Sequence, residues 1–299
     1  MSTSTIRLSI ITVNYNGLGD TCAMIRSLGD HLTGPCELIV VDNGSTRDEA
    51  AELRRRFPGI TVLRSERNLG FAGGNNLGIA AATGQYVLLL NNDTYVTDGS
   101  LGHLCDTLDA NPDMGAVSPK IRFAADPQPI QFAGYTPLSA ITLRNRLIGF
   151  NHTDDGSYDT PHDTPYAHGA AMMVRRETID RAGLMPELYF LYYEELDWSA
   201  RITRAGYRIG YDPGATVFHR ESRSTGTDSP LKVFYLTRNR LLFAWRNRNG
   251  IVRPLAILYQ LAVAGPKNAA AWLVRRRPDL ARATVRGVTA FFRIPHKTA

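Results

Sequence analysis

Three clusters of amide and carboxylate side chains come directly after apolar runs that are typical of buried strands. They are Asn14–Asn16 after "SIITV", Asp42–Ser45 after "LIVV" and Asn91–Asp93 after "LLL". Such residues close turns, because Asn and Asp side chains bond to their own backbone. Their oxygens are also the ligands that a divalent cation carrying a phosphate prefers. Each cluster taken alone leaves both interpretations open.

Another acidic group lies far downstream and follows two aromatic residues. Glu194, Glu195 and Asp197 come directly after Tyr192 and Tyr193, at the predicted start of a helix. Acids at this position cap a helix and compensate its dipole. An aromatic environment that excludes water would instead tune a carboxylate toward general-base catalysis. Both roles are compatible with the sequence.

His219, in "ATVFHRESRSTG", follows a predicted strand and precedes a Ser/Arg/Thr/Gly loop that suits anions. A lone histidine is commonly structural, so this alternative stays open. The chain has no GxGxxG after its first strand, no GxxxxGK[ST] and no GxSxG. These absences argue against a dinucleotide oxidoreductase, a P-loop enzyme and a serine hydrolase.

The elements that must position these residues alternate between strand and helix. Strands are predicted at 7–15, 36–45, 60–65 and 85–90, and helices at 18–32, 47–57 and 73–83. This alternation predicts an α/β fold with a parallel, doubly wound sheet. Ligands of such sheets bind beyond the carboxyl ends of the strands. The three strand-end clusters are therefore expected to form one site.

The second half of the chain is organised differently. Residues 120–166 are rich in proline and in predicted loops, and a helix is predicted over 195–205 with Gly206 as its stop. From Leu231 onward the sequence is helical and basic, with 14 Lys or Arg against one acid, whereas residues 1–230 carry 20 bases and 27 acids. This basic segment suits an anionic membrane, nucleic acid or a phosphorylated ligand. A solvated helical face explains it equally well.

Localisation is predicted from what the sequence lacks. The three cysteines form no CxxC pair, the first residues do not resemble a signal peptide, and no apolar run approaches the roughly 18 residues of a spanning helix. These features predict a cytoplasmic protein.

The order of motifs resembles the inverting family 2 glycosyltransferases, and within them the rhamnosyltransferase-like enzymes of bacterial polysaccharide assembly. The resemblance covers roughly residues 7–245 and rests on "SIITVNYNG", "LIVVDNGSTRDE", "RNLGFAGGNNLGI", "GQYVLLLNNDTYV", "HGAAMMVRRE", "YFLYYEELDWSARITRAGYRIGYDP", "VFHRESRSTG" and "YLTRNRLLF". It implies the GT-A fold, a nucleoside-diphosphate sugar as donor and a divalent metal. It also implies a catalytic domain at 1–230, with a nucleotide-sugar half near 1–118 and an acceptor half near 119–230, followed by a helical extension at 231–299.

The resemblance also implies roles for individual residues. Asp42 would hold the base or ribose, and Asp93 would bind the metal where the family has an Asp-x-Asp motif, of which this chain keeps only the last carboxylate. His219 would approach the metal or diphosphate. The other residues expected at the donor, its closing loop included, are Thr12, Asn14, Tyr15, Asn68, Asn76, Asn91, Asn92, Arg223 and Ser224.

The family's catalytic Glu-Asp motif falls on Glu194–Glu195, so that Glu195 stands where Asp is commoner. The resemblance therefore implies Glu195 as the base, with Asp197 as an alternative. The expected reaction is inverting transfer of L-rhamnose from dTDP-L-rhamnose, with Mg²⁺ or Mn²⁺, to a saccharide or lipid-linked saccharide. The basic C-terminus would contact the inner face of the membrane, and no nucleic acid is expected as a partner.

Three alternatives stay open at this point. The same chemistry could use a UDP-sugar or GDP-sugar. A metal-dependent nucleotidyltransferase would also use strand-end carboxylates, although "NYNGLGDT" lacks the Gly/Arg/Lys-rich phosphate loop expected there. A non-catalytic nucleotide-sugar-binding protein would keep Asp42 and tolerate loss of the acids, yet all the acids are present. The sequence does not indicate an oligomeric state.

Overall fold

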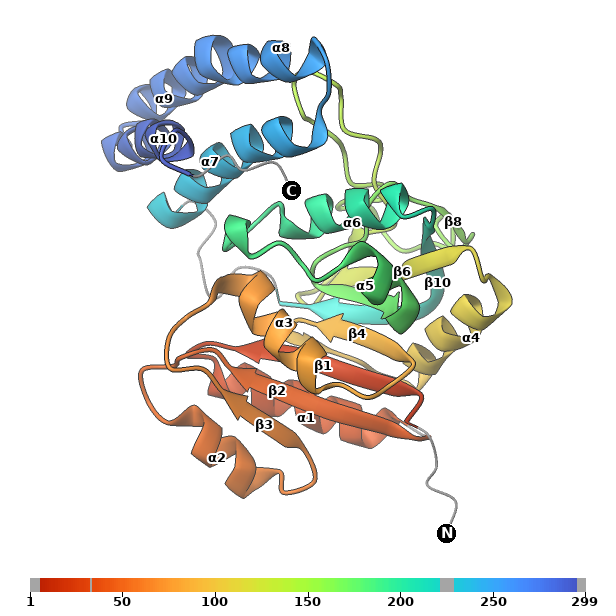
Figure 1. The fold of residues 1–299 in the computed structure, drawn as a ribbon. Coiled ribbons are helices and arrows are strands. Elements are labelled where there is room, and N and C mark those ends of the chain that lie inside the picture. Colours follow the sequence, from red (N-terminus) through yellow and green to blue (C-terminus); the bar gives the residue numbers. More distant parts are fainter. Residues whose placement is uncertain (1–5, 33, 221–228, 295–299) are drawn as a thin grey trace.

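The computed structural model describes residues 6–32, 34–220 and 229–294. A single mixed sheet of ten strands forms the body, and a group of helices from the C-terminal part of the chain lies beyond one edge of it (Figure 1). The strand order is β3-β2-β1-β4-β9-β6-β10-β5, with β7 beside β6 and β8 beside β10.

The first four strands form the parallel part of the sheet. They are β1 (Leu8–Asn14), β2 (Cys36–Asp42), β3 (Thr61–Arg64) and β4 (Tyr86–Leu90), connected by α1 (Leu18–His31), α2 (Glu49–Arg56) and α3 (Gly70–Ala81). The register pairs Asn14 with Asp42, so the polar ends of β1 and β2 are neighbours. The bounds of these elements agree with the sequence prediction to within three residues.

Helices cover both faces of the sheet because successive strand residues point to opposite sides. Ile10 and Val40 belong to a core with α1, α2 and α4 (His103–Ala110), whereas Ile11 and Val41 belong to a core with α3, α5 (Arg176–Ala182) and α6 (Glu194–Arg204). This two-sided burial explains the continuous apolar runs in β1, β2 and β4.

The sheet is mostly parallel in its first half, as predicted, and mixed in the rest. β9 (Ala171–Arg175) runs antiparallel to both of its neighbours, β4 and β6 (Met114–Phe123), and β10 (Arg208–His219) runs parallel to β6. The short elements are β5 (Thr94–Tyr95), η1 (Ser100–Gly102), β7 (Ile130–Phe132), β8 (His162–Asp163) and η2 (Glu187–Tyr189). β10 ends at His219 beside β5, which brings the histidine to Asp93 and the end of β4.

The C-terminal part is helical, as predicted, with two interruptions. Its elements are α7 (Pro230–Asn247), α8 (Val252–Tyr259), the π-helical η3 (Gln260–Ala264), α9 (Gly265–Val274) and α10 (Pro278–Phe291). The Ser229 hydroxyl accepts from the Lys232 amide at 3.2 Å and so caps α7. No helix within the described ranges is both long and apolar enough to cross a bilayer.

Candidate active site

The ends of β1 and β2 are joined through the Asn14 side chain. Its amide nitrogen donates to Glu49 at 2.8 Å and, at 3.3 Å each, to Asp42 and Ser45. Its carbonyl oxygen accepts from the Thr21 hydroxyl at 2.7 Å. Asn14 is fully buried. Its expected contact with the nucleotide is therefore replaced, in this arrangement, by a role in positioning Asp42.

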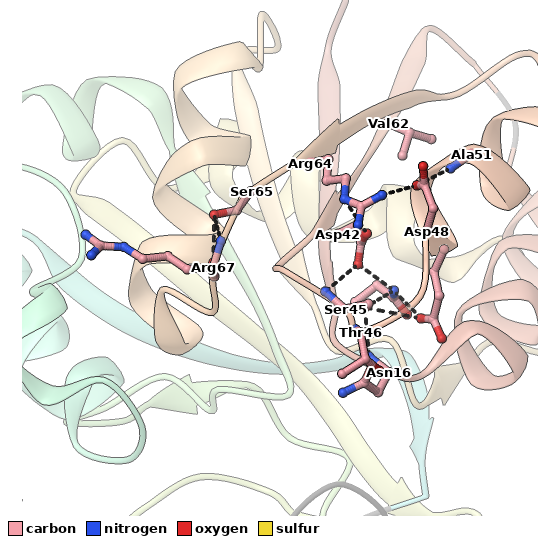
Figure 2. A network of polar contacts seen from close by, with 12 residues as sticks. Asn16, Asp42, Ser45, Thr46, Asp48, Ala51, Val62, Arg64, Ser65 and Arg67 are labelled. Atoms are coloured by element: carbon pink, nitrogen blue, oxygen red, sulfur yellow. Dashed lines mark hydrogen bonds and ion pairs between the residues drawn. The ribbon is translucent and has the colours of Figure 1, made fainter.

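One carboxylate oxygen of Asp42 has no hydrogen bond from any residue that the structure describes. Oδ1 accepts from Asn14 and from the Ser45 amide at 3.4 Å, whereas Oδ2 is buried and unbonded, with Arg64 Nε 3.8 Å away (Figure 2). A buried acceptor without a partner is costly. Oδ2 can therefore accept a hydroxyl or N–H of a ligand once the side chains that cover it move.

Thr12 and Tyr15 lie on either side of this strand end. Thr12 is fully buried and its hydroxyl has no hydrogen-bond partner among the described residues, so it shares with Asp42 the need for a rearrangement before a ligand can reach it. Tyr15 is exposed and offers an aromatic face on which a base could stack. Next to it, Asn16 accepts from the amide and hydroxyl of Thr46, at 2.9 and 2.7 Å (Figure 2).

The two asparagines expected in the donor pocket have different surroundings. Asn68 Oδ1 accepts from Asn43 at 3.1 Å and from the Gly70 amide at 2.8 Å, while its amide nitrogen has no partner in the described part of the chain. Asn76 exchanges two bonds with the Met185 backbone and donates to Glu187 at 2.9 Å. In this arrangement Asn76 anchors the segment before α6, and its contact with the donor sugar stays a prediction.

Asp93 and His219 form the polar centre of the site. His219 Nε2 lies 3.1 Å from Asp93 Oδ1 and 3.4 Å from the Asn91 amide nitrogen, and its other ring nitrogen, Nδ1, lies 2.9 Å from Gln131 Oε1. A partner on Nδ1 fixes the ring and leaves Nε2 free to be a ligand. Asn92 faces away from this pair and donates to Thr21 at 2.9 Å, so its place is beside α1.

This pair fits a divalent cation only in part. Within the described ranges, no three His, Cys, Asp or Glu side chains stand close enough together to hold a metal ion. One carboxylate and one imidazole would leave most coordination positions to diphosphate oxygens and water, which is how Mg²⁺ is commonly bound at phosphates. The donor set therefore fits a cation that arrives with its nucleotide.

The three acids at the start of α6 lie in three different environments. Asp197 is fully buried and accepts from Arg246 at 2.7 Å, from Tyr189 at 2.6 Å and from Asn247 at 3.1 Å. A carboxylate held by these donors is committed to joining α6 to α7. This geometry favours a structural role for Asp197 over the alternative role of base.

Glu194 and Glu195 differ from Asp197 in having no cation paired with them among the described residues. Glu194 is buried with Oε2 unbonded, and burial followed by the charge of Glu195 raises its pKa well above the usual range. Glu195 is half-buried, and burial raises its pKa to about 7. Glu195 can therefore gain and release a proton near physiological pH, whereas the Glu194 carboxyl holds its proton more tightly than an ordinary carboxyl does.

The segment before these acids is strained and is held from α7. Phe190, Tyr192 and Tyr193 all have positive φ, of 64°, 68° and 78°, which is unfavourable for aromatic residues. The buried Asn239 amide nitrogen lies within hydrogen-bonding distance of three carbonyl oxygens here, those of Tyr189 at 3.0 Å and of Leu191 and Tyr192 at 2.7 Å. Asn239 therefore fixes the backbone that leads into Glu194 and Glu195.

Two backbone contacts bring the acids to the strand-end side. The Phe71 amide donates to the Phe190 carbonyl at 2.7 Å, and a Cβ on Gly70 would lie 2.2 Å from that oxygen, so only glycine permits the approach. Gly169 faces the Glu195 side chain, because a Cβ on this glycine would lie 3.7 Å from Glu195 Cγ, and the next residue, Ala170, accepts from the Asn91 amide at 2.9 Å. Glu195 therefore lies one short segment away from Asn91 and the Asp93 pair.

Sequence reasoning missed two residues of this site. One is Asn239, which lies in the quoted motif "YLTRNRLLF" but was given no role. The other is His168, in "HGAAMMVRRE", whose ring is stacked on Tyr135 and whose pKa is lowered to about 3 by burial and by His219. Arg223 and Ser224 lie outside the described residues. No periodicity signals the roles of Asn239 and His168, because they depend on contacts between distant segments.

Comparison with known proteins agrees with this geometry. The model of glycosyl transferase family 2 matches residues 9–182, more than half of the chain. A low-salt glycan biosynthesis hexosyltransferase, Agl10, of Haloferax volcanii is 30% identical over 242 residues, which are 79% of this chain and 74% of the relative. An N-acetylglucosaminyl-diphospho-decaprenol L-rhamnosyltransferase of Mycobacterium tuberculosis is 27% identical over 248 residues, 74% of this chain and 78% of the relative.

A solved structure with the same fold is that of the mannosyltransferase PcManGT from Pyrobaculum calidifontis in complex with GDP-Man and Mn²⁺. It aligns with a TM-score of 0.61 at 17% identity, over 97% of this chain and 88% of that one. The fold is accordingly that of the GT-A glycosyltransferases. Together with the matched domain and the relatives, it shows that this chain belongs to glycosyltransferase family 2.

Proposed function

We propose that the protein transfers a sugar, with inversion, from a nucleoside-diphosphate donor to a saccharide acceptor, and that Glu195 is the catalytic base. The observation that carries this proposal is the contrast among the three acids of α6. Asp197 is bound to Arg246 and Glu194 is buried, whereas Glu195 is partly buried and burial raises its pKa to about 7. A base works best when its pKa is near the working pH.

The reaction is a single displacement. Glu195 accepts the proton of an acceptor hydroxyl as that oxygen forms a bond to the anomeric carbon. The bond from this carbon to the diphosphate oxygen breaks, and the nucleoside diphosphate departs with the bonding electrons. Because the hydroxyl attacks from the face opposite the diphosphate, the configuration at the anomeric carbon inverts. Burial raises the pKa of the neighbouring Glu194, which disfavours a second negative charge near the departing diphosphate.

The donor would lie along the strand ends. Asp42 Oδ2 and the free Asn68 amide would bond to the nucleoside and sugar, and Tyr15 would stack on the base. Asp93 and His219 would hold Mg²⁺ or Mn²⁺, with the Asn91 amide beside them. When bound, the cation neutralises the charge that develops on the leaving diphosphate.

The sugar and acceptor are proposed from the relatives. The name of the Mycobacterium tuberculosis relative, an N-acetylglucosaminyl-diphospho-decaprenol L-rhamnosyltransferase, supports L-rhamnose as the sugar and a lipid-linked saccharide as the acceptor. For this chain we propose dTDP-L-rhamnose as the donor, in synthesis of a cell-surface polysaccharide. A GDP-sugar is the second candidate, because the structurally similar mannosyltransferase binds GDP-Man with Mn²⁺.

A donor screen tests this proposal. Release of nucleoside diphosphate would be measured from dTDP-L-rhamnose, UDP-sugars and GDP-sugars, each with Mg²⁺, with Mn²⁺ and with a chelator. We expect turnover with one donor class that the chelator abolishes. Turnover only with a UDP-sugar or GDP-sugar would replace the rhamnose assignment. Release of inorganic diphosphate from a nucleoside triphosphate and a sugar phosphate would indicate a nucleotidyltransferase. Donor binding without turnover, with a lipid-linked saccharide as acceptor, would indicate a binding protein.

A further inference from the structure

The helix formed by α8, η3 and α9 carries an apolar stripe on its outer side. Large exposed residues recur at Ile251, Leu255, Leu258, Leu273 and Val274, and smaller exposed apolar residues at positions 262, 266 and 270 continue the row. Leu258 and Leu273 are each 58% exposed and Val274 is 84% exposed. Apart from Val274, which directly follows Leu273, these positions recur every three or four residues, the spacing that keeps side chains on one side of a helix.

The opposite face of the same helix is packed against the protein. Ala256, Gln260 and Ala264 are buried at four-residue spacing, and the Gln260 amide donates to the Thr142 carbonyl at 3.1 Å. In Figure 1 α8 and α9 lie on the far side of α7 from the parallel sheet. The stripe therefore faces away from the protein, while the opposite face of the helix packs against it. A docking surface requires this arrangement.

The charges around this stripe select its partner. Between residues 251 and 274 the only exposed charged side chain is Lys267, while Arg275 and Arg276 are exposed directly at the end of α9. The segment from Leu231 onward carries 14 basic residues and one acid. A second copy of this chain would bring a surface of the same sign to the interface, and like charges oppose such contact. An anionic lipid surface offers the complementary charge.

We propose that α8, η3 and α9 lie in the plane of an anionic lipid bilayer, with the stripe of Leu258 and Leu273 inserted among the lipids and Arg275 and Arg276 at the headgroups. A helix with one apolar face and flanking basic residues binds membranes in this way without crossing them. The basic residues alone give the electrostatic contact that the sequence suggests. The stripe adds insertion of apolar side chains and defines which face of the protein meets the lipid.

The same helical group reaches the active site through α7. Asn239 holds the backbone before Glu194, and the Arg240 guanidinium donates to the Tyr193 hydroxyl at 2.8 Å. Docking would therefore hold the base at a fixed place relative to the lipid surface. This consequence rests on the proposed function with a lipid-linked acceptor, whereas the docking itself does not.

Vesicle sedimentation without donor or acceptor tests the docking. The full chain would be mixed with vesicles of phosphatidylcholine alone or with added phosphatidylglycerol. The stripe variant would be Leu258→Glu with Leu273→Glu. Its matched control would be Leu77→Glu with Leu184→Glu, because those leucines are 38% and 45% exposed on the catalytic part of the chain. Circular dichroism would verify that each variant folds.

We expect the unmodified chain and the control to sediment with anionic vesicles. The affinity of the stripe variant for these vesicles should fall by at least about tenfold, because two apolar side chains no longer insert into the lipid. Changing Arg275 and Arg276 to Gln should weaken binding to anionic vesicles by about fivefold per arginine. Equal binding by the stripe variant and its control would overturn the insertion. The insertion would also be overturned if the unmodified chain did not bind vesicles and formed a dimer that is lost only in the stripe variant. A second copy of the chain would then cover the stripe.

Donor turnover is measured separately. Failure of vesicle binding in a protein that still releases nucleoside diphosphate would reject the docking alone, and vesicle binding by a protein without turnover would reject the proposed function alone.

Discussion

The side chains at the strand ends and the acids at the start of α6 have hydrogen-bond partners at different distances along the chain. Asn14 reaches Glu49, 35 residues away, within the first strand-helix-strand units. Asp197 is bound by Arg246, 49 residues away, and the backbone before Glu194 is held by Asn239 at 50 residues from Tyr189. The ends of β1 and β2 are thus held within the parallel part of the sheet, the Asp93 pair needs His219 from β10, and the base depends on a helix outside the sheet.

This difference separates binding of the donor from catalysis. Changes at the strand ends should weaken nucleotide or metal binding. Changes in α7 should leave nucleotide binding intact and lower turnover or stability, because α7 contacts the acids and not the strand ends. The predictions below test this separation.

The largest effect of a change on the strand-end side is expected for Asp93→Ala. Loss of the carboxylate paired with His219 should lower kcat/KM by about a thousandfold, because the charge on the departing diphosphate is no longer neutralised. Metal titrations of turnover would show a weaker requirement for a particular cation. Asp98→Asn, in the exposed turn that follows, serves as control. Full turnover by Asp93→Ala would contradict the proposal that Asp93 holds a metal at the strand ends.

Arg246→Met should destabilise the fold by about 2–3 kcal/mol, because it leaves the buried Asp197 carboxylate without its cation while Arg246 is itself partly exposed. Urea unfolding followed by circular dichroism measures this. Arg55→Met removes an exposed ion pair with Glu52 and should lower the free energy of unfolding much less, because solvent screens exposed charges. Equal effects of the two changes would mean that the Asp197 pair does not join α6 to α7.

Asn239→Ala should lower kcat by about tenfold to thirtyfold and leave the dissociation constant of the nucleoside diphosphate unchanged. The backbone before Glu195 loses the amide that holds its carbonyls, so the base is less well positioned. Asn249→Ala, an exposed asparagine after the same helix, should behave as the unmodified chain. A weaker nucleotide affinity in Asn239→Ala would show that the two sides are not separable.

The pH dependence should be smaller still. Burial raises the pKa of Glu195 to about 7, and the base acts in its deprotonated form. Turnover should therefore rise about tenfold per pH unit below 7 and level off above it. Nucleotide binding measured over the same range should not follow this curve. A rise in turnover centred near pH 4.5 would mean that Glu195 has the pKa of a solvent-exposed carboxyl, which contradicts its observed burial.

Much of the strand-end side can be predicted from the sequence. The apolar runs of β1, β2 and β4 mark buried strands, and their parallel order brings Asp42 and Asp93 to one edge. The role of Asn76 cannot be predicted in this way, because its amide bonds to Met185, 109 residues further along the chain. The role of Asn239 in α7 cannot be predicted either. Helical spacing indicates that this residue lies on a buried face, but it does not indicate which segment that face contacts. Nor does alternation of strands and helices reveal that β9 runs antiparallel.

The central claim is that Glu195 is the base, and Glu195→Gln tests it most directly. Glutamine keeps the size of the side chain and cannot accept the proton. With Asp197→Asn as the comparison, sugar transfer and nucleoside diphosphate affinity would be measured on the same preparations. We expect Glu195→Gln to lose transfer by at least about a thousandfold with unchanged affinity, and Asp197→Asn to lose stability with much of its transfer rate retained. Transfer retained by Glu195→Gln and lost by a folded Asp197→Asn would contradict the assignment.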